Sequence, residues 1–358
     1  MKIVIICGSL ERGKDGVGDY TRRLASELIA IGCDVRMLAL NDKHLVGSLH
    51  EVQLEQDQEI PTLRLGKDLG WKERTATAKV WIDAFNPSWL SLQYVPYAFQ
   101  DKGLPLFLGR YLKEMGGDRK WHVMFHELCI GLNRESSWKE KSIGFLQKQL
   151  IKYLLKQLQV TKISTQCTLY RVLLEKWTSQ EIQYLPLFSN IECLEFEGIE
   201  RKNGRFVLFG GIHKSLKVND FLWDVKEKFG KSAEFVFLGR NGSERQIWID
   251  ACERIGIQYQ IIGEVSTKEI SKTLRTAQYG VATTPSLLIE KSGSFAAYVN
   301  HGLTPICVSK SWTIMGFNEA NLDVMIWRNK NWHEVQKLNV VNREINDISK
   351  QLMIHLER

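Results

Sequence analysis

Short apolar runs alternate with amphipathic segments along the first half of the chain. An apolar run bounded by polar residues predicts a buried strand, and apolar residues three and four positions apart predict a helix. The strands expected on this basis are residues 2–7, 34–40, 89–95, 121–126 and 162–166. The helices expected are residues 18–30, 104–115 and 139–159. This alternation predicts a parallel sheet with helices on both faces.

The pattern restarts at residues 205–211, an apolar run that ends in two glycines. Further strands are expected at residues 234–242, 259–265, 279–286 and 304–309, with a helix at 218–229 and a terminal helix at 343–357. Because 358 residues exceed one typical core, we expect two Rossmann-like domains. The expected division is an N-terminal domain at 1–188, a linker at 189–204, a C-terminal domain at 205–340 and a terminal helix at 341–358, packed towards the N-terminal domain.

The predicted fold class is therefore α/β, with two Rossmann-like domains whose parallel sheets face each other across a cleft. Open α/β sheets bind ligands at the carboxyl ends of their strands, where the strand order reverses. The cleft between the two domains is thus the expected ligand site.

Composition places the chain among ordinary globular proteins, with 44% hydrophobic and 25% charged residues. The seven cysteines are scattered and form no C-x-x-C pair, which favours a reducing compartment over a disulfide framework. The first residues lack the pattern of a signal peptide, and no apolar stretch has the length of a membrane span. We therefore expect a cytoplasmic protein.

The net charge of +7 is mildly basic. It fits an anionic substrate, an anionic membrane surface or nucleic acid, and equally a surface charge that keeps the protein soluble. No recognised nucleic-acid-binding module occurs in the sequence, so nucleic acid is not an expected partner.

Three glycines, Gly13, Gly16 and Gly18, lie between the first strand and the first helix. Their spacing matches neither the G-x-G-x-x-G dinucleotide motif nor a P-loop. Glycines before a helix let a ligand approach the backbone, and the start of a helix attracts anions. The loop therefore fits either a ligand-facing segment or a tight turn without a ligand.

The second half holds two comparable segments. His213, Lys214 and Lys217 follow its first strand, and a lysine there can neutralise a phosphate or lie in a solvated turn. Glu290 is expected in a loop just before a short helix that Gly293 opens. A carboxylate there can accept hydrogen bonds from ribose hydroxyls or cap the helix.

Seven segments follow one another over nearly the whole chain: GVGDYTRRLASELIAIGCDV, FHE, LPLFSNI, FGGIHKSLKVNDFL, FLGRNG, GEVSTKEISKTLRTAQYGVATTPS and EKSGSFAAYVNHGLTPICV. In this order they resemble the motifs of retaining glycosyltransferases of the GT-B fold, in the family four type (group 1). The resemblance implies transfer of a sugar from a nucleotide sugar, UDP- or GDP-linked, with retention at the anomeric carbon. The implied acceptor is a glycan, a lipid-linked saccharide or a small molecule, and neither a cofactor nor a metal is expected.

The resemblance also implies roles for individual residues. His126 would lie beside the transferred sugar, and Glu290 would be the first glutamate of the family's E-x7-E element; these two are the expected catalytic residues. The expected donor-binding residues are Gly16, Gly18, Gly211, His213, Lys214, Lys217, Glu290, Ser292, Gly293, Ser294 and Tyr298. His122 shares a strand face with His126, and two histidines without carboxylate partners more often pack than bind zinc.

Two positions depart from the family pattern. Gly211 stands where the family has an arginine that contacts the diphosphate, and Tyr298 stands where it has the second glutamate. Two alternatives therefore stay open beside a glycosyltransferase: a catalytically impaired binding or regulatory protein, and another two-domain nucleotide-sugar enzyme such as an epimerase. The missing dinucleotide motif argues against a dehydrogenase.

Residues 138–160 are predicted to form a long helix with an apolar stripe and a lysine-rich surface. Such a helix fits the plane of an anionic membrane, as expected for an enzyme bound peripherally to the inner face of a membrane. It also fits an ordinary domain helix with a lysine-rich outer face, and the pattern favours this alternative over the membrane helix.

Overall fold

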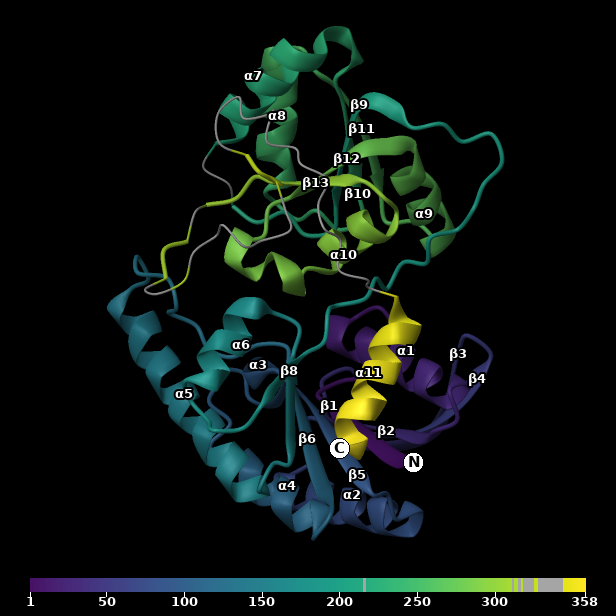
Figure 1. Ribbon diagram of the computed structural model, residues 1–358, viewed down its shortest axis with the longest axis vertical. Coiled ribbons are helices and arrows are strands. Elements are labelled where there is room, and N and C mark those ends of the chain that lie inside the picture. Colours follow the sequence, from purple (N-terminus) through teal and green to yellow (C-terminus); the bar gives the residue numbers. More distant parts are fainter. Residues whose placement is uncertain (215–216, 311, 315–316, 318–324, 328–343) are drawn as a thin grey trace. The chain divides into compact units, whose positions relative to one another are not determined.

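The computed structural model describes residues 1–214, 217–310, 312–314, 317, 325–327 and 344–358. They form two compact units, one of Met1–Pro186 with Ile345–Arg358 and one of Leu187–Glu344 (Figure 1). Residues 328–343, which were expected to end the second domain and begin the terminal helix, lie outside the described residues. Each unit is an α/β unit with its own sheet and core.

The sheet of the first unit has the strand order β3-β4-β2-β1-β5-β6-β7-β8. Its strands are β1 (Lys2–Cys7), β2 (Asp34–Asp42), β3 (Ser48–Glu55), β4 (Gln58–Gly66), β5 (Trp89–Tyr94), β6 (Lys120–Phe125), β7 (Lys162–Thr165) and β8 (Ile182–Tyr184). The five strands expected from the sequence are present, with ends that differ by at most two residues. They pair in parallel, as the apolar runs predicted.

The hairpin of β3 and β4 was not expected, and it is the antiparallel part of an otherwise parallel sheet. Its turn consists of Gln56 and Asp57, both in the left-handed backbone region with φ of 47° and 64°. A turn of this kind normally carries asparagine and glycine, and this pair lacks that signal. The prediction of a purely parallel sheet was therefore wrong at this edge.

Helices of the first unit are α1 (Gly16–Ala30), α2 (Trp71–Phe85), α3 (Pro96–Phe99), α4 (Leu108–Gly116), α5 (Trp138–Leu158), α6 (Thr168–Glu175) and α11 (Ile345–Glu357). The first of them begins two residues before the expected start at Gly18, because Asp15 caps it. In contrast, α4 begins four residues after the expected start at Leu104. Within the described residues, each helix is too short or too polar to cross a lipid bilayer.

The sheet of the second unit has the order β11-β10-β9-β12-β13-β14, and its described strand pairs are parallel. Its strands are β9 (Lys202–Phe209), β10 (Glu234–Leu238), β11 (Gln258–Gly263), β12 (Ala277–Ala282), β13 (Thr304–Cys307) and β14 (Met325–Ile326). Its helices are α7 (Val218–Phe229), α8 (Arg245–Ile255), α9 (Thr267–Thr276) and α10 (Gly293–Asn300), with short 3-10 turns η1 (Gly230–Ser232) and η2 (Ser286–Lys291). The start of β9 at Lys202 lies inside the segment expected to be a linker.

Both sheets reverse their strand order next to their first strand. In the first unit β1 pairs with β2 on one side and with β5 on the other. In the second unit β9 pairs with β10 on one side and with β12 on the other. Ligands of doubly wound sheets bind where the order reverses, so the carboxyl ends of these strands are the places to examine.

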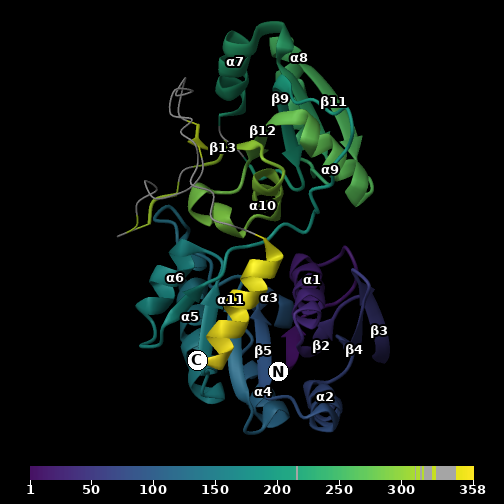
Figure 2. The ribbon, with the colours of Figure 1, turned by 45° about the vertical axis from the view of Figure 1, so that its right-hand side comes forward.

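The terminal helix α11 belongs to the first unit and packs beside α1 (Figures 1 and 2). The amide of Asn346 donates to Glu27 of α1 at 2.7 Å, and the apolar side of α11 is buried. Ile348, Leu352 and Leu356 supply this buried side. The helix α11 thus contributes buried side chains to the core of the first unit.

Replacing Leu352 by alanine should destabilise the first unit, because the loss of a fully buried leucine side chain would leave a cavity in the core. Such substitutions cost about 2–5 kcal/mol of unfolding free energy. Urea unfolding would measure the loss. Ile354→Ala on the same helix is the matched control, since that side chain is half exposed and should change the value by less than about 0.5 kcal/mol. Equal losses in the two variants would contradict this packing.

Candidate functional site

The glycine-containing loop between β1 and α1 is held by carboxylates. Oδ1 of Asp15 accepts hydrogen bonds from the amides of Val17 and Gly18 at 3.0 and 2.8 Å. Oδ1 of Asp19 accepts one from the amide of Gly13 at 3.1 Å. These amides are the groups that would otherwise attract an anion at the start of α1. The loop therefore suits the hydroxyl groups of a ligand better than its phosphates.

Two of the expected donor-binding glycines lie in this loop, and they differ in what surrounds them. A Cβ atom on Gly18 would lie 2.5 Å from the carbonyl oxygen of Ser9, so a glycine is needed there for packing. A Cβ atom on Gly16 would meet nothing within 4 Å. Of the two, Gly16 is the one whose surroundings leave room for a ligand.

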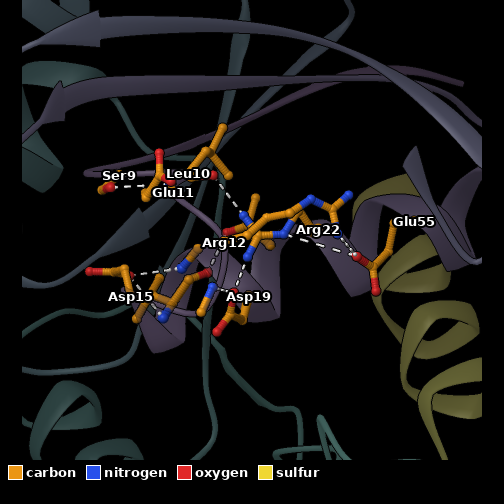
Figure 3. A network of polar contacts seen from close by, with 12 residues as sticks. Ser9, Leu10, Glu11, Arg12, Asp15, Asp19, Arg22 and Glu55 are labelled. Atoms are coloured by element: carbon orange, nitrogen blue, oxygen red, sulfur yellow. Dashed lines mark hydrogen bonds and ion pairs between the residues drawn. The ribbon is translucent and has the colours of Figure 1, made fainter. Parts of the chain in front are cut away.

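A network of charged side chains also holds the loop between β1 and α1 through hydrogen bonds to Leu10. Figure 3 shows the guanidinium of Arg22, which donates to the carbonyl of Leu10 at 2.8 Å and to the carboxylate of Asp19. On the neighbouring strand, Asp42 accepts hydrogen bonds from the amide of Leu10 at 3.1 Å and from Arg64 at 2.8 Å. Burial alone would raise the pKa of Asp42, but these hydrogen bonds outweigh it and the pKa is lowered. The sequence analysis missed this network. It also missed the cap formed by Asp15, although an aspartate just before a helix is a known capping signal.

The place where the first sheet reverses its order is closed by the short helix α3. A Cβ atom on Gly8, directly after β1, would lie 2.7 Å from the Cβ of Ala98 in α3. The side chain of Asn41 also ties this helix down, with a hydrogen bond of 2.8 Å to the carbonyl of Ala98. The carboxyl ends of β1 and β5 are therefore occupied by the protein itself.

His126, an expected catalytic residue, is buried directly after β6 and is held by its neighbours. Its Nε2 atom lies 2.9 Å from Oε1 of Gln93, a buried residue near the end of β5. The ring of Tyr20 from α1 meets the imidazole edge to face, with 4.8 Å between ring centres. Because an amide oxygen can only accept, Nε2 of His126 carries the proton in this contact.

The hydrogen bonds continue from Gln93 through the sheet in one direction. Nε2 of Gln93 donates to the hydroxyl of Ser91 at 3.0 Å, and that hydroxyl lies 2.8 Å from Nδ1 of His122. Nε2 of His122 lies 3.0 Å from the hydroxyl of Ser164 on β7. Burial lowers the pKa of His122 to about 3, so this ring is neutral at pH 7. The chain of contacts therefore orients the amide of Gln93, whose oxygen faces Nε2 of His126.

The second sheet has an open pocket where its order reverses. The pocket, of ≈ 230 Å³, is lined by Leu208, Phe209, Gly211, Ile212, Val281, Ala282, Thr283, Thr284, Ser292 and Ser294. These residues come from the carboxyl ends of β9 and β12 and from the start of α10. Of the expected donor-binding residues, the pocket brings together Gly211, Ser292 and Ser294. The sequence analysis missed Thr283 and Thr284, which lie within the strand predicted at residues 279–286 and were not singled out as ligand-binding residues.

Both serines are fixed at the start of α10. The hydroxyl of Ser292 accepts a hydrogen bond from the amide of Phe295 at 3.3 Å and so caps the helix. The hydroxyl of Ser294 donates to the carbonyl of Phe209 at 2.6 Å and thereby ties α10 to the end of β9. Gly210 makes this approach possible, since its φ is +78° and a Cβ atom there would lie 2.9 Å from that hydroxyl.

Tyr298 was expected to bind the donor, but the structure places it in the core beneath the pocket. It is fully buried, and its hydroxyl accepts from the amide of Phe209 at 2.8 Å and donates to the carbonyl of Val281 at 3.1 Å. These two backbone groups lie where β9 and β12 stop pairing. A Cβ atom on Gly280 would lie 2.3 Å from the tyrosine ring, so a glycine lets the ring lie against β12. The hydroxyl thus bridges the two strands and does not line the pocket.

The other expected residues of the second unit are not among those that line the pocket. His213 is exposed, and its backbone amide donates to the hydroxyl of Thr283 at 2.8 Å. Lys214 and Lys217 are exposed, and Lys217 stands just before α7. Glu290, expected in a loop, is half-buried in the 3-10 turn η2. Gly293 is the exposed first residue of α10.

Comparison with known proteins reveals similarity in structure, whereas no family model and no curated protein matches the sequence. HepE from Anabaena, solved with UDP and glucose, is similar at a TM-score of 0.60 and 12% identity, covering 100% of this chain and 98% of that one. The catalytic domain of starch synthase IV from Arabidopsis thaliana, bound to ADP and acarbose, gives 0.59 and 10%, covering 100% and 98%. UDP-GlcNAc 2-epimerase from Neisseria meningitidis, bound to UDP-GlcNAc, gives 0.55 and 11%, covering 100% of both chains. At such identities the likeness establishes the fold: the expectation of two Rossmann-like domains of the GT-B type is confirmed.

Replacing Tyr298 by phenylalanine should destabilise the second unit, because the amide of Phe209 and the carbonyl of Val281 would both lose a buried partner. The expected loss of unfolding free energy is about 1–3 kcal/mol. Urea unfolding would measure it. Tyr259→Phe is the matched control, since that hydroxyl bonds to Glu253 at the exposed surface. An unchanged stability of Tyr298→Phe would contradict the bridging role of the hydroxyl.

The stability of the first unit should depend on pH through His122. Its folded pKa of about 3 lies below the ordinary value of 6.5, so the unfolded chain binds the proton more tightly. Above pH 6.5 the ring is neutral in the folded and the unfolded chain, and the free energy of unfolding does not depend on this proton. Between pH 6.5 and pH 3 only the unfolded chain binds the proton, so the free energy of unfolding falls by up to about 1.4 kcal/mol for each pH unit. Burial lowers the pKa of His355 in the same unit as well, which adds to the loss.

Urea unfolding at pH 7 and at pH 5 would measure this dependence. His122→Asn should be less stable at pH 7 but should lose less stability between the two pH values. His50→Asn is the control, since His50 lies at the exposed surface and its removal should leave the pH dependence unchanged. Equal pH dependence in wild type and His122→Asn would contradict the assignment.

Proposed function

We propose that this chain is a glycosyltransferase that moves a sugar from a nucleotide sugar to a saccharide, lipid-linked or small-molecule acceptor, with retention at the anomeric carbon. The observation that carries the proposal is the pocket between the carboxyl ends of β9 and β12 at the start of α10. This is the position at which doubly wound sheets bind nucleotides. The similarity to proteins solved with UDP, ADP and UDP-GlcNAc supports a nucleoside diphosphate as part of the donor.

The surroundings of the pocket suit a diphosphate that leaves as an anion. The start of α10 carries the positive end of a helix dipole, and the hydroxyls of Ser292 and Ser294 lie there. Lys214 and Lys217 add two exposed cations at the loop after β9. Positive groups aimed at a leaving group stabilise the charge that develops in the transition state. We propose that they do so with a UDP- or GDP-sugar, without a cofactor or a metal ion.

In the first unit, His126 and the β1–α1 loop are proposed to contact the sugar. The imidazole of His126, oriented by its contact with Gln93, can hydrogen-bond a sugar hydroxyl. Asp15 and Asp19 give the loop carboxylate oxygens, which accept hydrogen bonds from hydroxyls and repel phosphates. Glu290 is proposed as the carboxylate near the transferred sugar, in keeping with the motif that it begins.

Two alternatives rest on particular observations. Tyr298 replaces a glutamate of the motif and is used inside the core, which favours a binding or regulatory protein that has lost catalysis. The likeness to a UDP-GlcNAc 2-epimerase favours another nucleotide-sugar enzyme of the same fold. Incubation with a nucleotide sugar in the absence of an acceptor separates them: an epimerase converts the sugar, a transferase at most hydrolyses the donor slowly, and a binding protein leaves it intact.

Nucleoside diphosphates should raise the melting temperature of the protein, because a ligand that binds the folded state stabilises it, by about 2.7 kcal/mol at a concentration one hundred times Kd. UDP, GDP, ADP, CMP and NAD would be compared in a thermal-shift assay. A shift with one diphosphate would identify the base of the donor. The retained configuration would then be read from the anomeric proton of the product by NMR. A shift with NAD alone, or with none of these ligands, would contradict a donor site.

Gly293→Glu offers a sharper version of this experiment. Its Cβ atom would meet nothing within 4 Å, and a carboxylate in the first turn of α10 favours the helix, so the fold should be retained. The same carboxylate should repel the diphosphate and weaken its binding by about tenfold, or ~1.4 kcal/mol. Gly70→Glu at the start of α2 is the matched control, since its Cβ also has open space. Unchanged diphosphate affinity in Gly293→Glu would place the donor elsewhere.

A further inference from the structure

The outward side of α5 carries large apolar residues that its own unit does not bury. The helix packs on the unit through Gly144, Gln147, Ile151, Leu154, Leu155 and Leu158. Four large side chains lie on the opposite side and are between 49% and 86% exposed: Trp138, Phe145, Leu146 and Tyr153. A helix that only covers a sheet has a polar outer side, so these residues require another explanation.

The apolar surface continues from α5 onto the turn before α4. Leu106 is 57% exposed and Phe107 is 65% exposed, although both precede a helix that packs against α5. Leu106 and Tyr153 line the same pocket of ≈ 210 Å³, together with Leu150. We call the exposed residues Leu106, Phe107, Trp138, Phe145, Leu146 and Tyr153 the apolar face. The helix α5 itself runs along the outer edge of the first unit (Figure 1).

Positive charge surrounds the apolar face. Residues 138–158 contain five lysines, Lys139, Lys141, Lys148, Lys152 and Lys156, and one acidic residue, Glu140. The carboxylate of Glu140 is used locally, where it accepts hydrogen bonds from the amide and hydroxyl of Ser137 at 2.8 Å. Four of the lysines are exposed, while Lys148 lies over the ring of Trp177 at 5.2 Å. The outward side of α5 is therefore both apolar and cationic.

We propose that the apolar face and the exposed lysines of α5 bind the surface of an anionic lipid bilayer. Exposed Trp, Phe, Leu and Tyr side chains enter the boundary between headgroups and acyl chains, and lysines beside them pair with anionic headgroups. The 21 residues of α5 include five lysines, and none of the described helices is sufficiently long and apolar to cross a membrane, so α5 would lie in the plane of the bilayer. The exposed lysines favour an anionic bilayer as the partner. A protein partner could bury the same apolar residues without any need for the lysines beside them.

The test is flotation of the full-length protein with vesicles of phosphatidylcholine and with vesicles of phosphatidylcholine and phosphatidylglycerol in equal parts. Binding is expected with the anionic vesicles at low salt, and it should weaken at high salt because screening shortens the reach of the lysines. Lys152→Glu combined with Lys156→Glu should reduce the binding by at least about 25-fold, at about fivefold for each lysine removed. Phe107→Ser should reduce it at every salt concentration.

Matched controls are available in the second unit. Lys268→Glu combined with Lys272→Glu changes two exposed lysines at the same spacing on α9, and Trp223→Ser removes an exposed aromatic residue of α7. Both controls should bind anionic vesicles as the wild type does, and the melting temperatures of all variants would establish that they fold. Equal losses in the lysine controls would mean that overall charge attracts the vesicles, which overturns the proposal.

Two further outcomes would also overturn it. One is the absence of binding to anionic vesicles at low salt. The other is self-association that depends on protein concentration and disappears in Phe107→Ser, without any vesicle binding, which would assign the apolar face to a second copy of the chain. Because flotation requires neither donor nor acceptor, these outcomes are independent of whether the chain transfers sugar.

Discussion

Backbone groups lose their hydrogen-bond partners where two neighbouring parallel strands separate at their carboxyl ends. The second unit depends on how these groups are hydrogen-bonded instead. Between β9 and β12 the hydroxyl of Tyr298 accepts from one strand and donates to the other. The strands are therefore held apart and satisfied at the same time, and a pocket of ≈ 230 Å³ stays open above the hydroxyl. An unpaired buried amide or carbonyl lowers the free energy of unfolding. The hydroxyl of Tyr298 prevents this loss at the separated ends of β9 and β12.

The two units resolve the same constraint in opposite ways. In the first unit α3 fills the gap between β1 and β5, with Ala98 against Gly8. In the second unit no such helix follows β12 within the described residues; the short turn η2 follows instead, and α10 begins beside the pocket. A common architecture thus yields one closed and one open strand-order reversal. This difference, more than any motif, favours the second unit as the one with room for a ligand at its strand ends.

The sequence predicted what depends on periodicity and missed what depends on single side chains. The buried strands and the helix at 218–229 were found because their apolar patterns are strong. The β3–β4 hairpin was missed because Gln56 and Asp57 adopt a turn that other residue pairs usually form. Tyr298 was expected in the pocket because it aligns with a ligand-binding glutamate, and only packing against Gly280 shows that a tyrosine there must be buried. Likewise, no spacing rule relates Gln93 to His126, which are brought together by the pairing of two strands.

Local charge decides which helix start can hold an anion. The starts of α1 and α10 are alike in architecture, since each follows a glycine-containing or serine-containing loop beside the first strand of its sheet. At α1 the cap is Asp15, whose carboxylate brings negative charge to the amides of Val17 and Gly18. At α10 the cap is Ser292, a neutral group that leaves the positive end of the helix dipole uncompensated by a carboxylate of its own. The capping side chain is therefore negative at α1 and neutral at α10, so this cap opposes an anion at the start of α1 and not at the start of α10.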